Sequence, residues 1–267
     1  MKVEYSETKR RPQKKKRRRL SKVGKIVVAS ASILLVVAIT VALMLTVLFN
    51  VSAVKVVGSS IYGSDEIVYA SGVMNGDNLF RLPSDEIESR IETALPYVKK
   101  AEIIKSFPDT VGIKVTPATE SILLQIDDGM FVADADYKVL RSVSEKNDNL
   151  LRIKGIKTES AKVGKALKFS DKQQKKVLAE LLEMCKENGL SVRFVNISNL
   201  VDIGFVVNES LYVKLGSYND MSSKIIHLTT AIKNMDKKVT ASISLENWSL
   251  SSKESTVKYE DISKYLE

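Results

Sequence analysis

The feature that most constrains this chain is an uninterrupted apolar run from Ile26 to Phe49, 24 residues without one charged side chain. At about 1.5 Å of rise per residue, a helix of this length slightly exceeds the ~30 Å hydrocarbon core of a bilayer. The main alternative is a cleavable secretory signal, because Val51-Ser52-Ala53 has the small residues of a cleavage site. Signal sequences carry only ~7–15 apolar residues, however. The run therefore predicts one uncleaved transmembrane helix over 26–49.

The arm before this run, residues 1–25, is strongly basic, with 12 Lys or Arg against two Glu. Its stretch from Lys14 to Arg19 matches a loose nucleic-acid or localisation pattern. Basic residues beside an apolar span are also retained on the cytoplasmic side, where anionic lipid headgroups provide the counter-charge. We favour this second interpretation, because the whole chain is only +9 and the rest of it is near neutrality. No extended basic surface for nucleic acid is predicted there, and we expect a cytoplasmic N-terminus and an extracellular C-terminus.

Residues 50–118 predict a small α+β domain. The tetrapeptide Ser-Asp-Glu-Ile occurs at Ser64 and again at Ser84. Each copy predicts the start of a short helix, with the serine as N-cap and two acids in the first turn, where the helix dipole favours negative charge. Alternating β-branched segments surround the two helices and predict strands. The expected order is strand, helix, helix, strand, strand, with the strands over Val51–Val57, Val98–Ile104 and Val111–Val115.

Residues 119–248 predict a mixed, β-rich domain of short strands with two helices, from Ser170 to Glu187 and from about Asp220 to Met235. The last predicted strand runs from Val239 to Leu245. The remaining residues, 249–267, are rich in Ser, Lys and Glu and predict a flexible polar tail. The fold class is therefore α+β: a basic arm, one transmembrane helix, two successive domains and a tail.

Several strings, taken in order, resemble one known family. The small domain is similar to the POTRA domain of the bacterial cell-division proteins FtsQ and DivIB, and later strings resemble the second, β domain of that family. The polar tail is typical of the Gram-positive DivIB branch. The matching strings are Val54-Lys55-Val56-Val57-Gly58, Asn78-Leu79-Phe80, Phe107-Pro108-Asp109-Thr110-Val111, Asp128-Gly129-Met130-Phe131-Val132-Ala133-Asp134 and Leu211-Tyr212-Val213-Lys214-Leu215-Gly216.

Residues suited to catalysis are scarce. His227 is the only histidine and Cys185 the only cysteine, and both fall within predicted helices. Asp134 and Asp136 form a D-x-D pair, but their place between two short strands predicts a turn instead of a metal site. No glycine-rich phosphate loop is present. We therefore expect no catalytic, cofactor-binding or metal-binding residues and no enzyme activity; the alternative is a signal-anchored cell-wall hydrolase or transferase.

The resemblance implies a non-enzymatic, single-pass scaffold of the divisome, concentrated at the division septum. It also implies partners: the single-span proteins FtsL and FtsB, called DivIC in Gram-positives, and through them the septal peptidoglycan synthase FtsW with its transpeptidase. The last predicted strand is the candidate docking edge, because an open edge offers unpaired N–H and C=O groups to a partner strand. Trp248 is either a core residue or an interface anchor. The partner-binding candidates are Ser242, Ile243, Ser244, Leu245 and Trp248.

Overall fold

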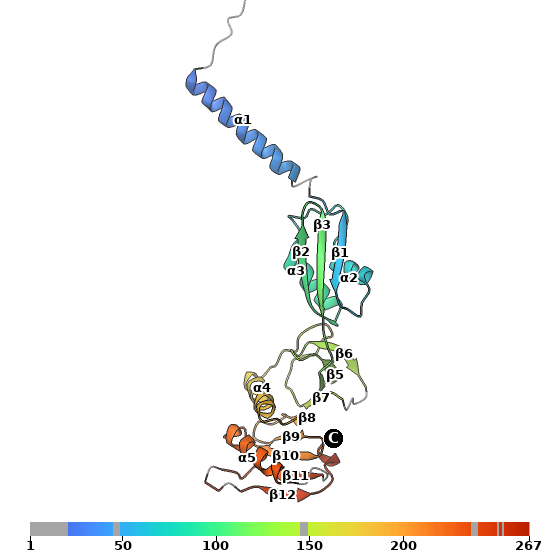
Figure 1. Ribbon diagram of the computed structural model, residues 1–267, viewed down its shortest axis with the longest axis vertical. Coiled ribbons are helices and arrows are strands. Elements are labelled where there is room, and N and C mark those ends of the chain that lie inside the picture. Colours follow the sequence, from blue (N-terminus) through green and yellow to red (C-terminus); the bar gives the residue numbers. More distant parts are fainter. Residues whose placement is uncertain are drawn as a thin grey trace, which may run out of the picture.

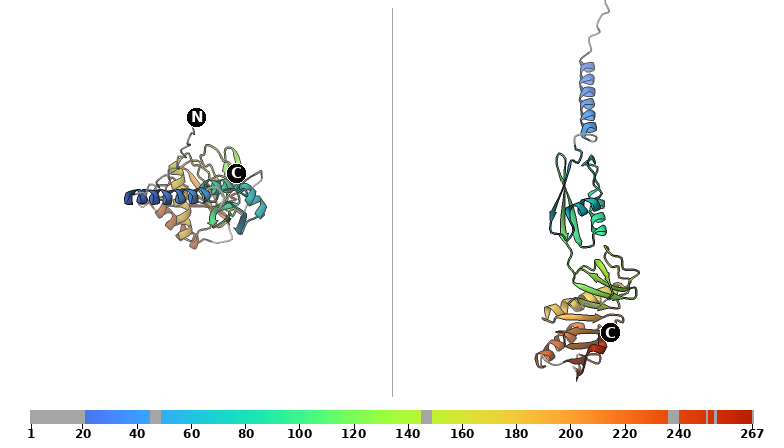
Figure 2. Two further views of the ribbon diagram at one scale, coloured as in Figure 1. Left: turned by 90° about the horizontal axis from the view of Figure 1, so that it is seen from above. Right: turned by 90° about the vertical axis from the view of Figure 1, so that its right-hand side faces the viewer.

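The structure, a computed structural model, describes residues 21–44, 49–144, 149–235, 240–249, 251–252 and 254–266. The molecule is elongated: a long helix stands at one end, a three-stranded sheet with two helices follows, and a nine-stranded sheet lies at the far end (Figure 1). Figure 2 shows the same succession from the side. The predicted α+β class and the order of apolar helix, small domain and β-rich domain are confirmed, whereas the basic arm before Ser21 lies outside the described residues. We call residues 49–118 the proximal domain and residues 119–266 the distal domain, by their distance from the long helix.

Helix α1 (Lys22–Leu43) is the predicted apolar helix. It begins before the predicted start at Ile26, because Ser21 caps it: the Ser21 hydroxyl accepts a hydrogen bond of 3.1 Å from the Gly24 N–H. This bond satisfies one of the N–H groups that the first helical turn leaves free. None of its residues is buried, and it is long and apolar enough to cross a membrane. The predicted continuation over residues 45–48 lies outside the described residues.

The proximal domain has the predicted strand and helix order. Its central strand, β3, runs parallel to β1 and antiparallel to β2, and the two helices pack on one face of this sheet. The fully buried Ile67, Ile91 and Ile113 join both helices to the sheet in one apolar core. The elements are β1 (Ala53–Gly58), α2 (Ser64–Ser71), α3 (Ser84–Ala94), β2 (Val98–Ser106) and β3 (Thr110–Pro117).

The starts of the two short helices differ from the prediction in one respect. Their first turns do carry the predicted acids, but the N-caps are Gly63 and Pro83, and neither makes a side-chain cap bond. The serines therefore stand inside the helices. At α2 the Glu66 carboxylate compensates, because it accepts a hydrogen bond of 3.0 Å from the Gly63 N–H.

The distal domain is built on a nine-stranded sheet in the order β12-β11-β10-β9-β8-β7-β4-β5-β6. Helices α4 and α5 pack on one face, where residues such as Leu178, Leu181 and Leu228 complete the larger core with Phe205 and Val213. The elements are β4 (Ile122–Ile126), β5 (Gly129–Ala133), β6 (Val139–Val143), β7 (Leu151–Lys154), α4 (Lys172–Glu187), β8 (Val192–Asn196), β9 (Ile203–Val207), β10 (Leu211–Gly216), α5 (Met221–Lys233), β11 (Ala241–Ser244) and β12 (Thr256–Tyr259).

The predicted flexible tail is instead structured over most of its described part. Residues Thr256–Tyr259 form β12, which pairs antiparallel with β11, and Ser263–Tyr265 form a short 3-10 helix, η2. Beyond β12, Ile262, Tyr265 and Leu266 pack against Phe194 and Val206, on the sheet face that α4 and α5 leave open. The composition of residues 249–267 is polar on average and therefore gave no sign of these apolar residues, which lie together on one surface. Both faces of strand β9 are buried as a result.

Side chains of the distal domain hold it against the proximal domain. The buried Lys138 ammonium donates hydrogen bonds to the backbone oxygens of Glu92, at 2.7 Å, and Val98, at 2.5 Å. Beside them, the Glu120 carboxylate accepts hydrogen bonds from the Tyr97 hydroxyl, at 2.6 Å, and from the Arg141 guanidinium, at 2.7 Å. These contacts orient the two domains relative to each other.

Candidate partner-binding edge

The candidate strand β11 lies inside the sheet. It runs parallel to β10 and antiparallel to β12, with Ser244 opposite Lys214 on one side and Thr256 on the other. The prediction that this strand is the last of its domain and has an open edge is wrong. It fails because Thr256–Tyr259 forms a strand of its own, β12, which pairs with the other side of β11.

The five predicted contact residues therefore have little free surface. Ile243 and Leu245 are fully buried in the larger core, and Ser242 is 9% exposed. Ser244 is half-buried. Trp248 is 7% exposed and belongs to the same core, so the structure decides for the core alternative. These residues lie behind β12 or in the core, where they support the terminal strand.

Trp248 lies next to the lone histidine. The Trp248 and His227 ring centroids are 5.8 Å apart, and His227 Nε2 is 3.0 Å from the Ser255 hydroxyl, one residue before β12. His227 thus links α5 to the start of β12. The indole N–H of Trp248 is buried, and no described residue accepts a hydrogen bond from it.

Strand β12 is the terminal strand of the nine-stranded sheet as the structure describes it. All four of its residues are exposed, including the large side chains of Val257 (37%) and Tyr259 (66%). Its outer side presents backbone N–H and C=O groups that β11 does not use, and an edge of this kind is a template for another strand. This edge lies at the end of the molecule opposite α1 (Figure 1).

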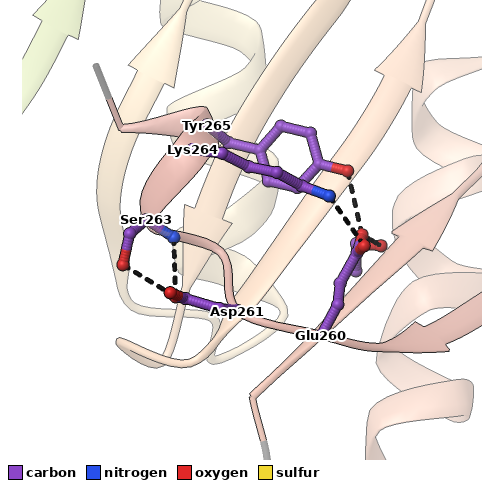
Figure 3. Close-up of polar contacts among 6 residues, drawn as sticks. Glu260, Asp261, Ser263, Lys264 and Tyr265 are labelled. Atoms are coloured by element: carbon purple, nitrogen blue, oxygen red, sulfur yellow. Dashed lines mark hydrogen bonds and ion pairs between the residues drawn. The ribbon is translucent and has the colours of Figure 1, made fainter.

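A compact polar cluster follows β12 and fastens it to the sheet. Figure 3 shows the Glu260 carboxylate facing the Lys264 ammonium, at 2.7 Å, and the Tyr265 hydroxyl, at 2.9 Å. The same carboxylate accepts a hydrogen bond of 2.6 Å from the Ser242 hydroxyl on β11. These partners, Lys264 foremost, lower the pKa of Glu260 to about 2, so it is ionised at neutral pH. Asp261 turns away to accept hydrogen bonds from Ser263.

Two further contacts secure the end of the chain. The Tyr265 and Tyr212 rings stack with their centroids 3.9 Å apart, and the Arg152 guanidinium donates a hydrogen bond of 2.6 Å to the Leu266 backbone oxygen. Strand β12 is therefore held by the segment that follows it as well as by its pairing with β11. The alternation of Val257 and Tyr259 with polar residues is the sequence signal that could have identified this strand.

Asp134 and Cys185 have structural roles. Asp134 Oδ1 accepts hydrogen bonds of 2.9 Å from the N–H groups of Asp136 and Lys138, which confirms the predicted turn. Cys185 is fully buried, and burial raises the pKa of its thiol to about 12. Within the described ranges, no three His, Cys, Asp or Glu side chains are grouped so that they could hold a metal ion.

Comparisons with known proteins agree on one family. Residues 49–116 match the model of the FtsQ-type POTRA domain. The cell division protein DivIB of Clostridium botulinum strain Hall is 27% identical over 222 residues, which are 82% of this chain and 83% of that protein. The cell division protein DivIB of Clostridium acetobutylicum is 22% identical over 71% of this chain and 77% of its own length.

The cell division protein FtsQ of Corynebacterium glutamicum is 22% identical over 70% of this chain and 80% of its own length. All three alignments extend well beyond the POTRA domain. The relatives are named as cell division proteins, which supports a role in the divisome, and the apolar helix α1 fits a membrane-anchored protein of the septum. The chain therefore carries an FtsQ-type POTRA domain over residues 49–116, and over 70–82% of its length it is similar to relatives named as the cell division proteins DivIB and FtsQ.

Proposed function

We propose that this protein is a non-enzymatic scaffold of the divisome that holds single-span partners by strand addition at β12. The partners are an FtsL-like and an FtsB/DivIC-like protein, and through them FtsW and its transpeptidase are positioned for septal peptidoglycan synthesis. The observation that carries the proposal is the exposed terminal edge of the nine-stranded sheet, at the end of the molecule farthest from α1.

The membrane anchor supports this function by confining both domains near the bilayer. The basic arm, residues 1–25, precedes α1, so the arm is cytoplasmic and both domains are extracellular, as in a type II protein. Confinement to a surface raises the effective concentration of a partner that is anchored in the same membrane. Modest contacts at β12 are then sufficient to hold the partner.

Strand addition suits the chemistry of this edge. Each backbone hydrogen bond to a partner strand contributes about 0.5–1.5 kcal/mol net. The exposed Val257 and Tyr259 side chains offer an additional apolar surface to the partner. Ser242, Ile243 and Ser244 act one strand behind the edge, where they pair with β12, and Leu245 and Trp248 fill the core beneath them.

Cross-linking in living cells tests the proposal. The photoreactive residue p-benzoylphenylalanine replaces Tyr259 on β12 and, in a matched control, Tyr69 on α2, which is 90% exposed. We expect light to trap the FtsL-like or FtsB/DivIC-like protein from position 259 and neither of them from position 69. Trapping from both positions, or from neither, would contradict a docking edge at β12.

Protease protection tests the orientation separately. In intact protoplasts, added protease should remove both domains and leave the basic arm joined to α1. A mature protein that begins near Val54 would instead show that the apolar run is cleaved and would rule out the anchor.

A further inference from the structure

The end of the proximal domain nearest α1 is formed by three segments that are distant in the sequence. They are residues 49–52 before β1, the loop between α2 and α3, and the turn between β2 and β3. Figures 1 and 2 show the start of β1, the end of β2 and the start of β3 at this end, next to the last turn of α1. We call this surface the proximal tip.

Three phenylalanines, one from each segment, form a single cluster at the proximal tip. The Phe49 ring packs edge-on against Phe80, at 4.9 Å between centroids, and against Phe107, at 5.6 Å. Phe80 and Phe107 are 5.2 Å apart. Phe49 is half-buried against the domain core, but Phe80 is 49% and Phe107 59% exposed. Met74, in the same loop as Phe80, is 70% exposed. Large adjoining apolar side chains left in water cost free energy and mark a binding surface.

The cluster is firmly held against the end of α1. The Leu79 N–H donates a hydrogen bond of 2.8 Å to the Phe49 backbone oxygen, so the Phe80 loop is attached to the chain that leaves the helix. The Asn78 side-chain amide donates a hydrogen bond of 3.1 Å to the Met44 backbone oxygen at the C-cap of α1. The aromatic surface therefore lies at the depth where the apolar helix ends.

Two carboxylates at the tip, those of Asp77 and Asp109, are each held by a hydrogen bond within the domain. The Asp77 carboxylate accepts a hydrogen bond of 2.8 Å from the Met74 N–H, and the Asp109 carboxylate accepts one of 2.5 Å from the Ser52 hydroxyl. Both acids thus have partners within the domain. Arg81, next to Phe80, is exposed, and its guanidinium is the kind of group that binds lipid phosphates.

We propose that Phe80 and Phe107, backed by Phe49, seat the proximal tip in the interfacial layer of the bilayer, among the glycerol groups and upper acyl chains of the leaflet into which α1 leads. Large apolar side chains such as Phe are buried at the boundary between headgroups and acyl chains, and an exposed apolar cluster beside a membrane span is covered there without a protein partner. The seat orients the proximal domain, and the contacts at Lys138 then carry that orientation to the distal domain. This inference rests on the proposed membrane anchor but not on the proposed partners.

Fluorescence quenching by lipid tests the seat on the full chain. Trp248 is the only tryptophan, so Trp248→Phe provides a dark background into which Phe107→Trp places one indole probe. The protein is reconstituted into vesicles of phosphatidylcholine and phosphatidylglycerol whose acyl chains carry bromine. Ile61→Trp is the matched control, because Ile61 is 72% exposed and follows the far end of β1. Flotation of the protein with the vesicles in alkaline carbonate tests the anchor independently.

We expect the brominated lipid to quench the indole at position 107 and its emission to be blue-shifted, and we expect the indole at position 61 to show neither effect. The attachment to α1 by itself keeps position 107 near the lipid. To separate this effect from insertion of the cluster, Phe80→Ser is added to the probe variant, and it should remove most of the quenching at position 107. The control Val57→Ser, at a site of similar exposure (51%) near the far end of β1, should leave the quenching at position 107 unchanged. Floating protein whose probe at position 107 is unquenched, or quenching that Phe80→Ser leaves intact, would overturn the seat while leaving the anchor in place.

Discussion

The Lys138 ammonium lies 2.5 Å from the Val98 backbone oxygen, across the junction of the two domains. Lys138 precedes β6 in the distal domain, and Val98 begins β2 in the proximal domain. Burial lowers the pKa of this lysine, and the nearby carboxylates of Glu92 and Asp134 partly oppose the shift. A long basic side chain is seldom buried unless it is paired, so these two bonds to backbone oxygens explain why a lysine stands here.

Replacing Lys138 should loosen the junction. Lys138→Met keeps the length of the side chain but leaves the backbone oxygens of Glu92 and Val98 without their donor. Loss of a partner at a buried polar group costs about 1–3 kcal/mol, and we expect a drop of that size in the free energy of unfolding of residues 49–267, measured with urea. Lys99→Met removes an ion pair to Asp136 whose side chains are 45% and 69% exposed, and it should change little. Equal effects of the two variants would contradict a special role for Lys138.

Acid should release β12 from the sheet. The folded pKa of Glu260, about 2, lies below its ordinary value of 4.5. The carboxylate therefore contributes stability that is fully present above about pH 4.5 and is lost as the pH falls towards 2. We expect the β12 amides to exchange hydrogen faster, relative to those of β10, across this range.

Glu260→Gln should produce the same release at neutral pH and remove its dependence on acid. Glu102→Gln, in an exposed ion pair with Lys114 in the proximal domain, is the control and should leave β12 protected. Protection of β12 that is unchanged in Glu260→Gln would show that strand pairing alone holds the segment.

Substitutions at Trp248 and Tyr259 should affect two different properties, the stability of the distal domain and the binding of the partner. Trp248 is a core residue, so Trp248→Ala should destabilise the distal domain by about 3–5 kcal/mol, as large-to-small core substitutions do. Tyr259→Ala, at an exposed position on β12, should change stability by less than about 0.5 kcal/mol yet weaken capture of the partner's extracellular segment. Thermal unfolding and pull-down of both variants measure the two effects. A stable Trp248→Ala variant, or unweakened capture by Tyr259→Ala, would contradict this division.

Ser244→Pro is expected to act indirectly. Ser244 pairs with Lys214 and with Thr256, so proline at this position disrupts the pairing inside the sheet. We expect faster hydrogen exchange in β12 together with weaker capture of the partner. If capture is weaker while the β12 amides stay protected from hydrogen exchange, β11 itself is the strand that contacts the partner.

The Cys185 thiol should be unreactive in the folded protein. It is fully buried, and its pKa is raised to about 12 from an ordinary 9.0. A disulfide reagent at pH 8 should label it only after unfolding in urea. Because the thiol ionises more readily in the unfolded chain, its contribution to stability should fall as the pH rises above about 9. Full labelling in native buffer would show that the α4 face opens.

The sequence determined the features that depend on short stretches of chain. A membrane-spanning helix is predicted by the length and composition of one run, so the apolar helix was identified without knowledge of its neighbours. Acids repeated after Ser64 and Ser84 marked the two short helices, and alternating apolar residues marked most strands. The turn at Asp134 was predicted correctly for the same reason, because its hydrogen bonds are local.

Only the tertiary structure decided which edge of the sheet is open, because a strand is an edge only when no other segment pairs beside it, and the sequence of the strand itself does not show this. The pairing of β12 makes β11 an inner strand, where the sequence predicted an edge, and makes part of an apparently polar tail the terminal strand of the sheet. The cluster of Phe49, Phe80 and Phe107 and the burial of Lys138 likewise arise from segments far apart in the chain. Local sequence carries no information about such contacts, since they exist only after the domains have folded and packed.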